Sequence, residues 1–517
     1  MPRQAFRGRA IGLLLPVLLT AAACAVGPSV RPVIAVNDGS PQAKPGEQAT
    51  GSLPPLDKPS GSTVSWSECG GGARARLGEL AANTALAVRC GRIINELDAP
   101  NSPGVGDVAL SVLRAGTGDI PLVVLNDVAG EPGTVYAAKL ASKLPPELLK
   151  TFFLVGMDRR GTGTSDPAQC VPDQVRARIV GFDPASSQLD GLLDAAHKAS
   201  QECVLDMDDR LAALDSWRTA ADVDELRKQL GVPKLNAIGH GDGSRVLTVY
   251  ADRYADRVGR LVLDGSPDPT LDPAGAAQAG AVGAEAAYTA FAADCKARAC
   301  PLGGDPRQAL TGLLEQVRAK PLVNPNGAQL TAGGVLQGVL TGLADRSGWP
   351  ALAEAISKAA GGDGTALGRY TAPLLGVVNG NPARLDAQLT QCNDTQTRLP
   401  PEQISGMVKD WSGKMPLFGG LFAQRLLLCS SWPVPAKPLA APSGHGAPPI
   451  LVLSTASDPV TPEEGTARTA RQLASGVLVS WQGGGHGALA QSPCATAAAQ
   501  QFLTNALVPA DGTACPP

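Results

Sequence analysis

The chain has 517 residues, with 44 lysines and arginines against 47 aspartates and glutamates, which gives a formal net charge of −3. This balance supplies no broad cationic surface, which argues against nucleic acid as a partner. Charged residues make up 18% of the chain and hydrophobic residues 44%. These values are typical of a globular protein and exclude a disordered one.

The first residues have the pattern of an export signal. Three arginines precede an uncharged run over residues 11–23, which as a helix would span about 20 Å, less than the roughly 30 Å of a bilayer core. Three alanines and Cys24 end the run and resemble a bacterial lipobox, in which the cysteine is lipidated. We expect residues 1–24 to be a lipoprotein-type signal peptide, with ordinary cleavage beside an incidental Cys24 as the alternative.

The next segment, residues 25–62, is rich in Pro, Gly and Ser and lacks periodicity. This composition is typical of a tether, here one that would lift the body of the protein off a membrane. We therefore expect an extracytoplasmic protein, lipid-anchored to the outer face of a bacterial membrane or secreted. No later segment is long and apolar enough to span a bilayer, so the lipid anchor would be the sole membrane contact.

Apart from Cys24 the chain contains ten cysteines. An even number in an exported chain is what a disulfide framework needs. The sequence has no Cys-x-x-Cys or His-x-x-x-His pair, so we predict no metal site. Neighbouring cysteines are expected to pair, because such bonds would staple loops locally: Cys69–Cys90, Cys170–Cys203, Cys295–Cys300, Cys392–Cys429 and Cys494–Cys515.

Short apolar runs alternate with helical patterns from about residue 85 to 265. The runs typical of buried parallel strands are 121–126, 152–158, 235–240 and 260–264. Between the second and third, Val223, Leu226 and Leu230 recur at helical spacing, and Gly231 ends the helix. This alternation predicts a doubly wound, mostly parallel α/β sheet, with its first part over residues 63–266.

Residues 267–443 differ in pattern, because long Ala- and Leu-rich helical stretches such as 276–293 dominate them. Strand patterns return at 449–457 and 477–481. We therefore predict an inserted helical cap at 267–443 and the rest of the core at 444–517. In such sheets ligands bind at the carboxyl ends of the strands, so a peptide or small-molecule ligand is expected in a cleft under the cap.

Two polar residues follow the last two of these strands. Asp458 comes directly after the first, and His486 lies in a glycine-rich loop after the second. Because both sit at carboxyl ends of consecutive strands, they could converge, with the carboxylate orienting the imidazole. Singly, each has a structural alternative as a turn cap or a solvated loop residue. Together they predict a catalytic acid–histidine pair.

An α/β-hydrolase places its nucleophile at the centre of a Gly-x-Ser-x-Gly turn between a strand and a helix, ahead of the acid and the histidine. The matching turn here is Gly-His-Gly-Asp-Gly over residues 239–243. Its central residue, Gly241, has no atom that can attack a carbonyl, so no acyl-enzyme can form there.

Seven motifs are spread over most of the chain that follows the tether. They are GMDRRGTGTSDP at 156–167, TAADVDELRKQLG at 219–231, LDG at 263–265, the Cys295/Cys300 pair with PLG after it, CSSWP at 429–433, DPVTP at 458–462 and GHG at 485–487. Together they resemble the secreted tripeptidyl-aminopeptidase-like branch of the α/β-hydrolases, serine exopeptidases related to prolyl iminopeptidases. The resemblance implies an α/β-hydrolase fold, with Asp458 as the acid and His486 as the base.

The chain departs from this family at the oxyanion loop as well as at Gly241. The usual Gly-Gly-Pro-Gly reads NDVAGEPG at 126–133. An oxyanion hole aims backbone N–H groups at developing negative charge, and we place it at the backbone of Asp242 and Glu131. Their carboxylates would oppose that charge if they pointed in, or could bind the terminal ammonium of a peptide.

Three functions stay open from these residues. The first is a catalytically impaired homologue that binds peptides or surface partners. The second is a working hydrolase that uses water activated by His486, or a displaced nucleophile such as Ser244, one helical turn past Gly241. The third is a dinucleotide site, from Gly239, Gly241 and Ser244 after a strand with Asp264 ending the next. No cofactor is expected under the first two functions.

Overall fold

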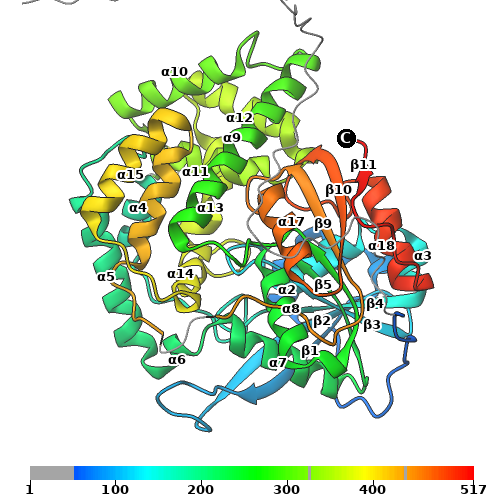
Figure 1. Cartoon of the computed structure of the whole chain (residues 1–517). Coiled ribbons are helices and arrows are strands. Elements are labelled where there is room, and N and C mark those ends of the chain that lie inside the picture. The colour runs from blue at the N-terminus through cyan, green and yellow to red at the C-terminus, as the bar shows by residue number, and fades with distance from the viewer. Residues whose placement is uncertain (1–51, 324–327, 436–438) are drawn as a thin grey trace, which may run out of the picture. The chain divides into compact units, whose positions relative to one another are not determined.

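The computed structural model describes residues 52–323, 328–435 and 439–517 (Figure 1). The predicted signal peptide, Cys24 and most of the predicted tether lie outside the described residues. Within these described residues, no helix has the length and apolar character that crossing a bilayer requires.

One nine-stranded sheet forms the centre of the described chain, in the order β1-β2-β4-β3-β5-β6-β9-β10-β11. From β4 onward neighbouring strands are parallel, whereas β1, β2 and β4 pair antiparallel. The sheet is thus doubly wound and mostly parallel, as predicted. The bounds are β1 Arg89–Glu96, β2 Asp107–Ala115, β3 Ile120–Leu125, β4 Phe152–Met157, β5 Leu235–His240, β6 Val258–Asp264, β9 Ile450–Ser457, β10 Gly476–Gly484 and β11 Thr513–Cys515.

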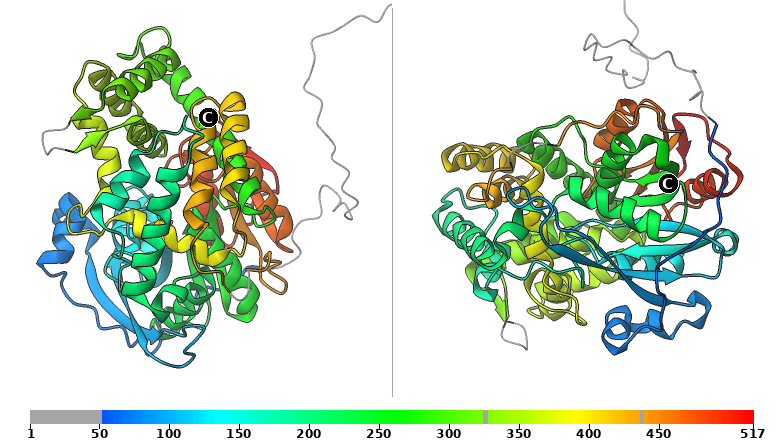
Figure 2. Two further views of the ribbon diagram at one scale, coloured as in Figure 1. Left: turned by 90° about the vertical axis from the view of Figure 1, so that its left-hand side faces the viewer. Right: turned by 90° about the horizontal axis from the view of Figure 1, so that it is seen from below.

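The two faces of the sheet carry separate apolar clusters, because successive side chains of a strand point to opposite faces. In β3, Val123 and Leu125 join one cluster and Leu122 and Val124 the other. Helices cover both faces (Figure 2). The first cluster includes α7 (Ser216–Gln229) and α8 (Asp242–Arg253), and the second includes α2 (Gly133–Ala141), α3 (Pro146–Thr151) and α18 (Pro493–Asn505).

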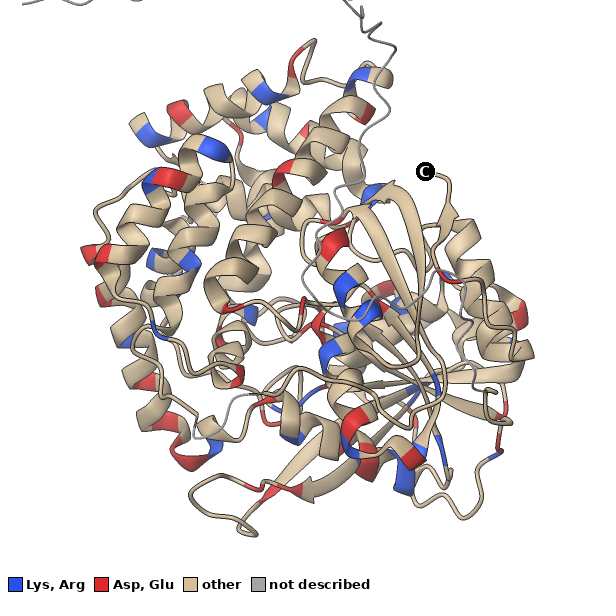
Figure 3. Ribbon diagram, in the orientation of Figure 1, with Lys and Arg blue, Asp and Glu red and all other residues tan. Residues whose placement is uncertain are grey.

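A third apolar cluster holds the helical cap together. The main helices between β6 and β9 are α9 Pro273–Ala297, α10 Pro306–Ala319, α11 Ala332–Leu343, α12 Trp349–Ala360, α13 Thr365–Leu375, α14 Arg384–Leu389, α15 Pro401–Lys414 and α16 Gly419–Arg425. Acidic and basic residues are interspersed along the cap and the core (Figure 3).

The cap also includes a segment that the sequence analysis assigned to the core. Helices α4 (Asp173–Gly181) and α5 (Asp190–Met207) place their buried side chains in the cap cluster. Their apolar faces therefore meet cap helices instead of the sheet. The predicted boundary at residue 267 missed this contribution, because a helix that packs on a cap and one that packs on a sheet show the same periodicity.

The predicted tether is also too long at its end. The carbonyl of Pro54 accepts hydrogen bonds from Arg260, and the N–H of Ser60 donates to the carbonyl of Gly231 at 2.8 Å. Leu53 and Leu56 pack against an apolar cluster of the core. The segment from about residue 53 onward thus lies on the core, although its composition resembles a linker.

The ten cysteines outside the signal segment form five disulfides in the structure. These join the neighbouring pairs expected from the sequence, Cys69–Cys90, Cys170–Cys203, Cys295–Cys300, Cys392–Cys429 and Cys494–Cys515. Disulfides in this number are typical of proteins that fold outside the cytoplasm.

A buried ion pair ties the loop after β4 to α7. Both charged side chains are at most 1% exposed, and the guanidinium of Arg160 makes two 2.7 Å hydrogen bonds to the carboxylate of Asp222. Arg160 also donates to the carbonyls of Leu97 and Ala213. Because these contacts satisfy both ions, removing one partner would strand the other in the interior.

We expect Arg160→Met to lower the free energy of unfolding by about 3–5 kcal/mol, because Asp222 would stay buried without its partner. The double variant Arg160→Met/Asp222→Leu should be less destabilised than Arg160→Met. Chemical denaturation measures both. Lys414→Met, which removes an exposed pair with Asp410, is the control and should cause no measurable change. A double variant with a lower free energy of unfolding than Arg160→Met would contradict this expectation.

Candidate active site

The turn between β5 and α8 has the tight geometry expected of a nucleophile elbow. Gly241 adopts φ 57° and ψ −124°, a backbone conformation that residues other than glycine rarely adopt. A Cβ on Gly239 would lie 2.7 Å from the backbone of Ser244, and one on Gly243 would lie 2.5 Å from the carbonyl oxygen of Leu125. The flanking glycines are therefore required by close packing, and Gly241 is at the apex.

The structure brings the predicted pair Asp458 and His486 together. Both lie in loops at the carboxyl ends of β9 and β10, and Nδ1 of His486 is 3.1 Å from each carboxylate oxygen of Asp458. Asp458 also accepts hydrogen bonds from the N–H groups of Thr461 and Gly487. With His486 8% exposed and Asp458 1% exposed, the imidazole is fixed in one orientation.

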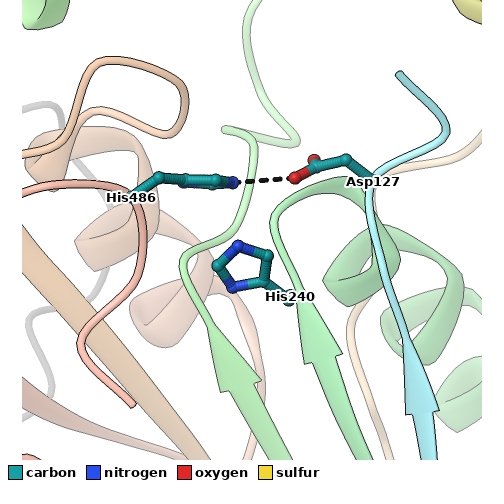
Figure 4. Close-up of side chains that lie close together, drawn as sticks. All are labelled: Asp127, His240 and His486. Atoms are coloured by element: carbon teal, nitrogen blue, oxygen red, sulfur yellow. Dashed lines mark hydrogen bonds and ion pairs between the residues drawn. The ribbon is translucent and has the colours of Figure 1, made fainter. Parts of the chain in front are cut away.

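A third residue, Asp127, faces the other nitrogen of this imidazole (Figure 4). It directly follows Asn126 at the end of β3, and its Oδ2 lies 2.8 Å from Nε2 of His486. Its Oδ1 accepts the backbone N–H of Asp242 at 2.7 Å. In a serine hydrolase that N–H, of the residue after the nucleophile, serves the oxyanion hole.

The carboxylate of Asp127 also fills the space next to Gly241. A Cβ on Gly241 would lie 2.0 Å from Oδ1 and 2.4 Å from Oδ2 of Asp127. No real Cβ sits this close to a carboxylate, so a serine side chain and this Asp127 conformer exclude each other. Asp127 thus stands where a nucleophile would project toward His486.

The charges of the three side chains depend on one another. Burial opposes charge on His486, but Asp458 and Asp127 outweigh burial and raise its pKa well above the usual value. Burial likewise favours the neutral acids, yet His486 brings the pKa of Asp127 down to about 2 and lowers that of Asp458. An imidazolium between two carboxylates donates from both nitrogens and has no lone pair to accept a proton from an attacking group.

His240, the residue before Gly241, forms a second histidine–carboxylate pair. Its Nδ1 is 3.1 Å from Oδ2 of Asp264 at the end of β6. Its ring stacks on Tyr136 and lies 4.2 Å from the ring of His486, measured between centroids. Sequence reasoning did not assign His240 to the site, because it ends a buried strand as ordinary core residues do.

Asp264 also holds the loop that carries His486. Its Oδ1 accepts the N–H groups of Ala488 and Leu489 at 2.7 and 3.0 Å, and its side chain is 1% exposed. The dinucleotide alternative needed this carboxylate to contact a ribose. Its oxygens are instead occupied by His240 and the loop backbone, so the structure gives that alternative no support.

Of the carboxylates near the expected oxyanion hole, neither that of Asp242 nor that of Glu131 faces His486. The side chain of Asp242 is paired with Arg159 at 2.6 Å and also accepts hydrogen bonds from Val128 and Gln391. The carboxylate of Glu131 is 27% exposed and pairs with Lys139. The backbone N–H of Asp242 does point into the site, where Asp127 occupies it.

Ser244, the displaced nucleophile considered from the sequence, is fully buried. Its hydroxyl lies 2.9 Å from the carbonyl oxygen of Gly239 and 2.5 Å from that of Gly265. The hydroxyl therefore ties the first turn of α8 to the neighbouring strand ends. It makes no hydrogen bond with either described histidine of the site.

Asp127 is the residue that sequence reasoning missed. It lies in the NDVAGEPG segment, where the departure from the family pattern drew attention to Glu131. The sequence did contain a signal, because Asp127 is the second residue after β3. Residues at this position lie at the carboxyl edge of a parallel sheet. Its contact with His486 spans 359 positions of sequence, which no local pattern reveals.

Comparison with known proteins agrees with this architecture. Residues 415–515 match the family model described as TAP-like protein. Serine protease Hip1 of Mycobacterium tuberculosis is 29% identical over 468 residues, which cover 82% of this chain and 87% of that protein. The tripeptidyl aminopeptidase of Streptomyces coelicolor is 26% identical over 409 residues, 75% of this chain and 74% of that protein.

Among solved structures, a thermophilic esterase from Thermogutta terrifontis aligns with 78% of this chain and 96% of its own at 15% identity, with a TM-score of 0.35. A TM-score this low supports no conclusion about function. The sheet order, the elbow after β5, and the acid and histidine after β9 and β10 define the protein as an α/β-hydrolase in fold. The family match over residues 415–515 and the two relatives make the chain similar to the TAP-like branch, in agreement with the resemblance that the motifs carry.

We expect Gly241→Ala to destabilise the protein, because its Cβ would meet the carboxylate of Asp127 and its backbone conformation is strained by about 1–3 kcal/mol. Thermal unfolding should show a lower midpoint. Adding Asp127→Gly should leave only the backbone strain, so the two effects should be strongly non-additive. Gly413→Ala is the control, since nothing lies within 4 Å of its Cβ position. Strict additivity would contradict the proposed collision.

Proposed function

We propose that this protein is an exported, TAP-like α/β-hydrolase-fold protein that binds peptides or a peptide-bearing surface partner without cleaving them through an acyl-enzyme. The observation that carries the proposal is the position of Asp127, whose carboxylate takes the space of the missing side chain at Gly241. Serine-type hydrolysis needs an attacking oxygen at this place, and the carboxylate of Asp127 sits there instead.

The same carboxylate also blocks the second requirement of acyl transfer. A tetrahedral intermediate is stabilised by N–H groups aimed at its oxyanion, and the N–H of Asp242 already donates to Asp127 at 2.7 Å. A substrate carbonyl would have to displace a carboxylate that is held by a buried imidazole, which removes the advantage of a preorganised site.

A peptide as ligand is supported by the relatives, because a serine protease and a tripeptidyl aminopeptidase share most of their length with this chain. The cap covers the carboxyl side of a parallel sheet, where such folds bind ligands. The five disulfides favour an extracytoplasmic location. We propose that Cys24 carries a lipid that anchors the protein to the outer face of the cell membrane.

A fluorophosphonate probe, which labels activated serines covalently, tests the loss of catalysis. We expect no labelling of the natural protein, nor of Gly241→Ser, because Asp127 would obstruct the new hydroxyl. The double variant Asp127→Gly/Gly241→Ser removes the obstruction and frees the Asp242 N–H, and we expect it to be labelled. Mass spectrometry locates the label.

Ser244→Ala in the double variant is the matched control and should leave labelling unchanged. Labelling of the natural protein at any serine beside His486 would refute the proposal. Labelling of Gly241→Ser alone to the same extent as the double variant would show that Asp127 does not obstruct the site.

Peptide binding is measured separately by calorimetry, with tripeptides that carry a free terminal amine. We expect saturable binding and, by mass spectrometry, an intact peptide after prolonged incubation. The proposal fails if the peptides are cleaved by the natural protein, or if none of a panel with varied side chains binds. An N-acetylated tripeptide is the control for recognition of the terminal ammonium.

A further inference from the structure

Three side chains of the candidate active site point atoms that could bind a metal ion toward one another. Asp127, His240 and His486 each offer one such atom, and all three atoms lie within 4.8 Å of one another. In Figure 4 the nitrogen of His240 that is not bonded to Asp264 points toward the line that joins His486 and Asp127. The described chain thus gathers two imidazoles and one carboxylate at one place, where the histidines are 7% and 8% exposed.

Each histidine is oriented from behind by a carboxylate. Nδ1 of His240 faces Asp264 at 3.1 Å, and Nδ1 of His486 faces Asp458 at 3.1 Å. Histidines that bind metals usually donate their other ring N–H to such a partner, which fixes the tautomer and makes the ligating nitrogen more basic. A serine triad contains one histidine that a carboxylate orients in this way. Here two neighbouring histidines are each oriented by a carboxylate of their own.

We propose that Asp127, His240 and His486 bind a divalent transition-metal ion, zinc in the protein's native setting. The ion would lie among Nε2 of each histidine and the carboxylate of Asp127, and its binding would release to solvent the proton that His486 Nε2 donates to Asp127. Three protein ligands leave one position of a tetrahedral zinc open, as in zinc enzymes. The inference does not depend on peptide binding, because it concerns only these side chains.

The geometry is close to what zinc requires. Bonds of about 2.0–2.1 Å place tetrahedral ligand atoms roughly 3.4 Å apart. The 2.8 Å contact between His486 and Asp127 would therefore open slightly, and a separation at the 4.8 Å limit would close by about 1.4 Å. Asp127 can supply its part of this movement by side-chain rotation, since no side chain at Gly241 confines it.

The donor set and the setting select the metal. Imidazole ligands suit zinc, copper, iron and nickel, whereas magnesium and calcium prefer all-oxygen sites. A chain with five disulfides matures in an oxidising compartment, where redox-inactive zinc is a stable occupant. The negative charges of Asp127, Asp264 and Asp458 would compensate a buried divalent ion.

The test uses the untagged full-length protein, stripped with a chelator and titrated with zinc by calorimetry. We expect one zinc per chain and a higher thermal midpoint. His240→Ala, His486→Ala and Asp127→Ala should each weaken zinc binding roughly 100-fold or more. Asp458→Asn and Asp264→Asn, which change only the positioning residues, should weaken it about 10–100-fold.

Two exposed histidines provide matched controls, since His197→Ala and His445→Ala should bind zinc as the natural protein does. Cobalt(II) added to the stripped protein should give the visible absorption of a four-coordinate ion, and each ligand variant should lose it. Circular dichroism confirms that each variant is folded. Absence of zinc binding by the natural protein, or unchanged binding by folded His240→Ala, would overturn the inference.

Discussion

The contact between Asp127 and His486 governs the chemistry of this site. Nε2 of His486 and Oδ2 of Asp127 lie 2.8 Å apart. This contact determines where the imidazole proton lies and places the Asp127 carboxylate next to Gly241, where it accepts the backbone N–H of Asp242. Asp127 can make this contact only because Gly241 has no side chain. The absence of a side chain at Gly241 and the position of the Asp127 carboxylate therefore depend on each other.

The rest of the catalytic framework of an α/β-hydrolase is intact around this exchange. The elbow keeps its backbone conformation, the acid holds the histidine, and Asp264 fixes the histidine loop through two N–H groups. This framework holds the two histidines and the acid in a buried, hydrogen-bonded arrangement.

Sequence patterns predicted the sheet, the elbow and the Asp458–His486 pair, because these rest on local periodicity and on strand ends that share one edge. They missed strands β1 and β2, whose burial alternates and whose apolar signal is weaker. They also missed Asp127 and His240 as site residues. Tertiary packing decides which side chains meet at the carboxyl edge of the sheet. The residues that meet there are more than a hundred positions apart in the sequence, and no rule of local spacing predicts such contacts.

The cap has a consequence for the assembly of the protein. Helices α4 and α5 bury their apolar faces against helices encoded between residues 273 and 429. When the chain is made from its N-terminus, this earlier pair of helices is complete more than sixty residues before the first of its partner helices begins. Cys170–Cys203 closes within that early segment, so oxidation can hold the two helices as a hairpin during the delay.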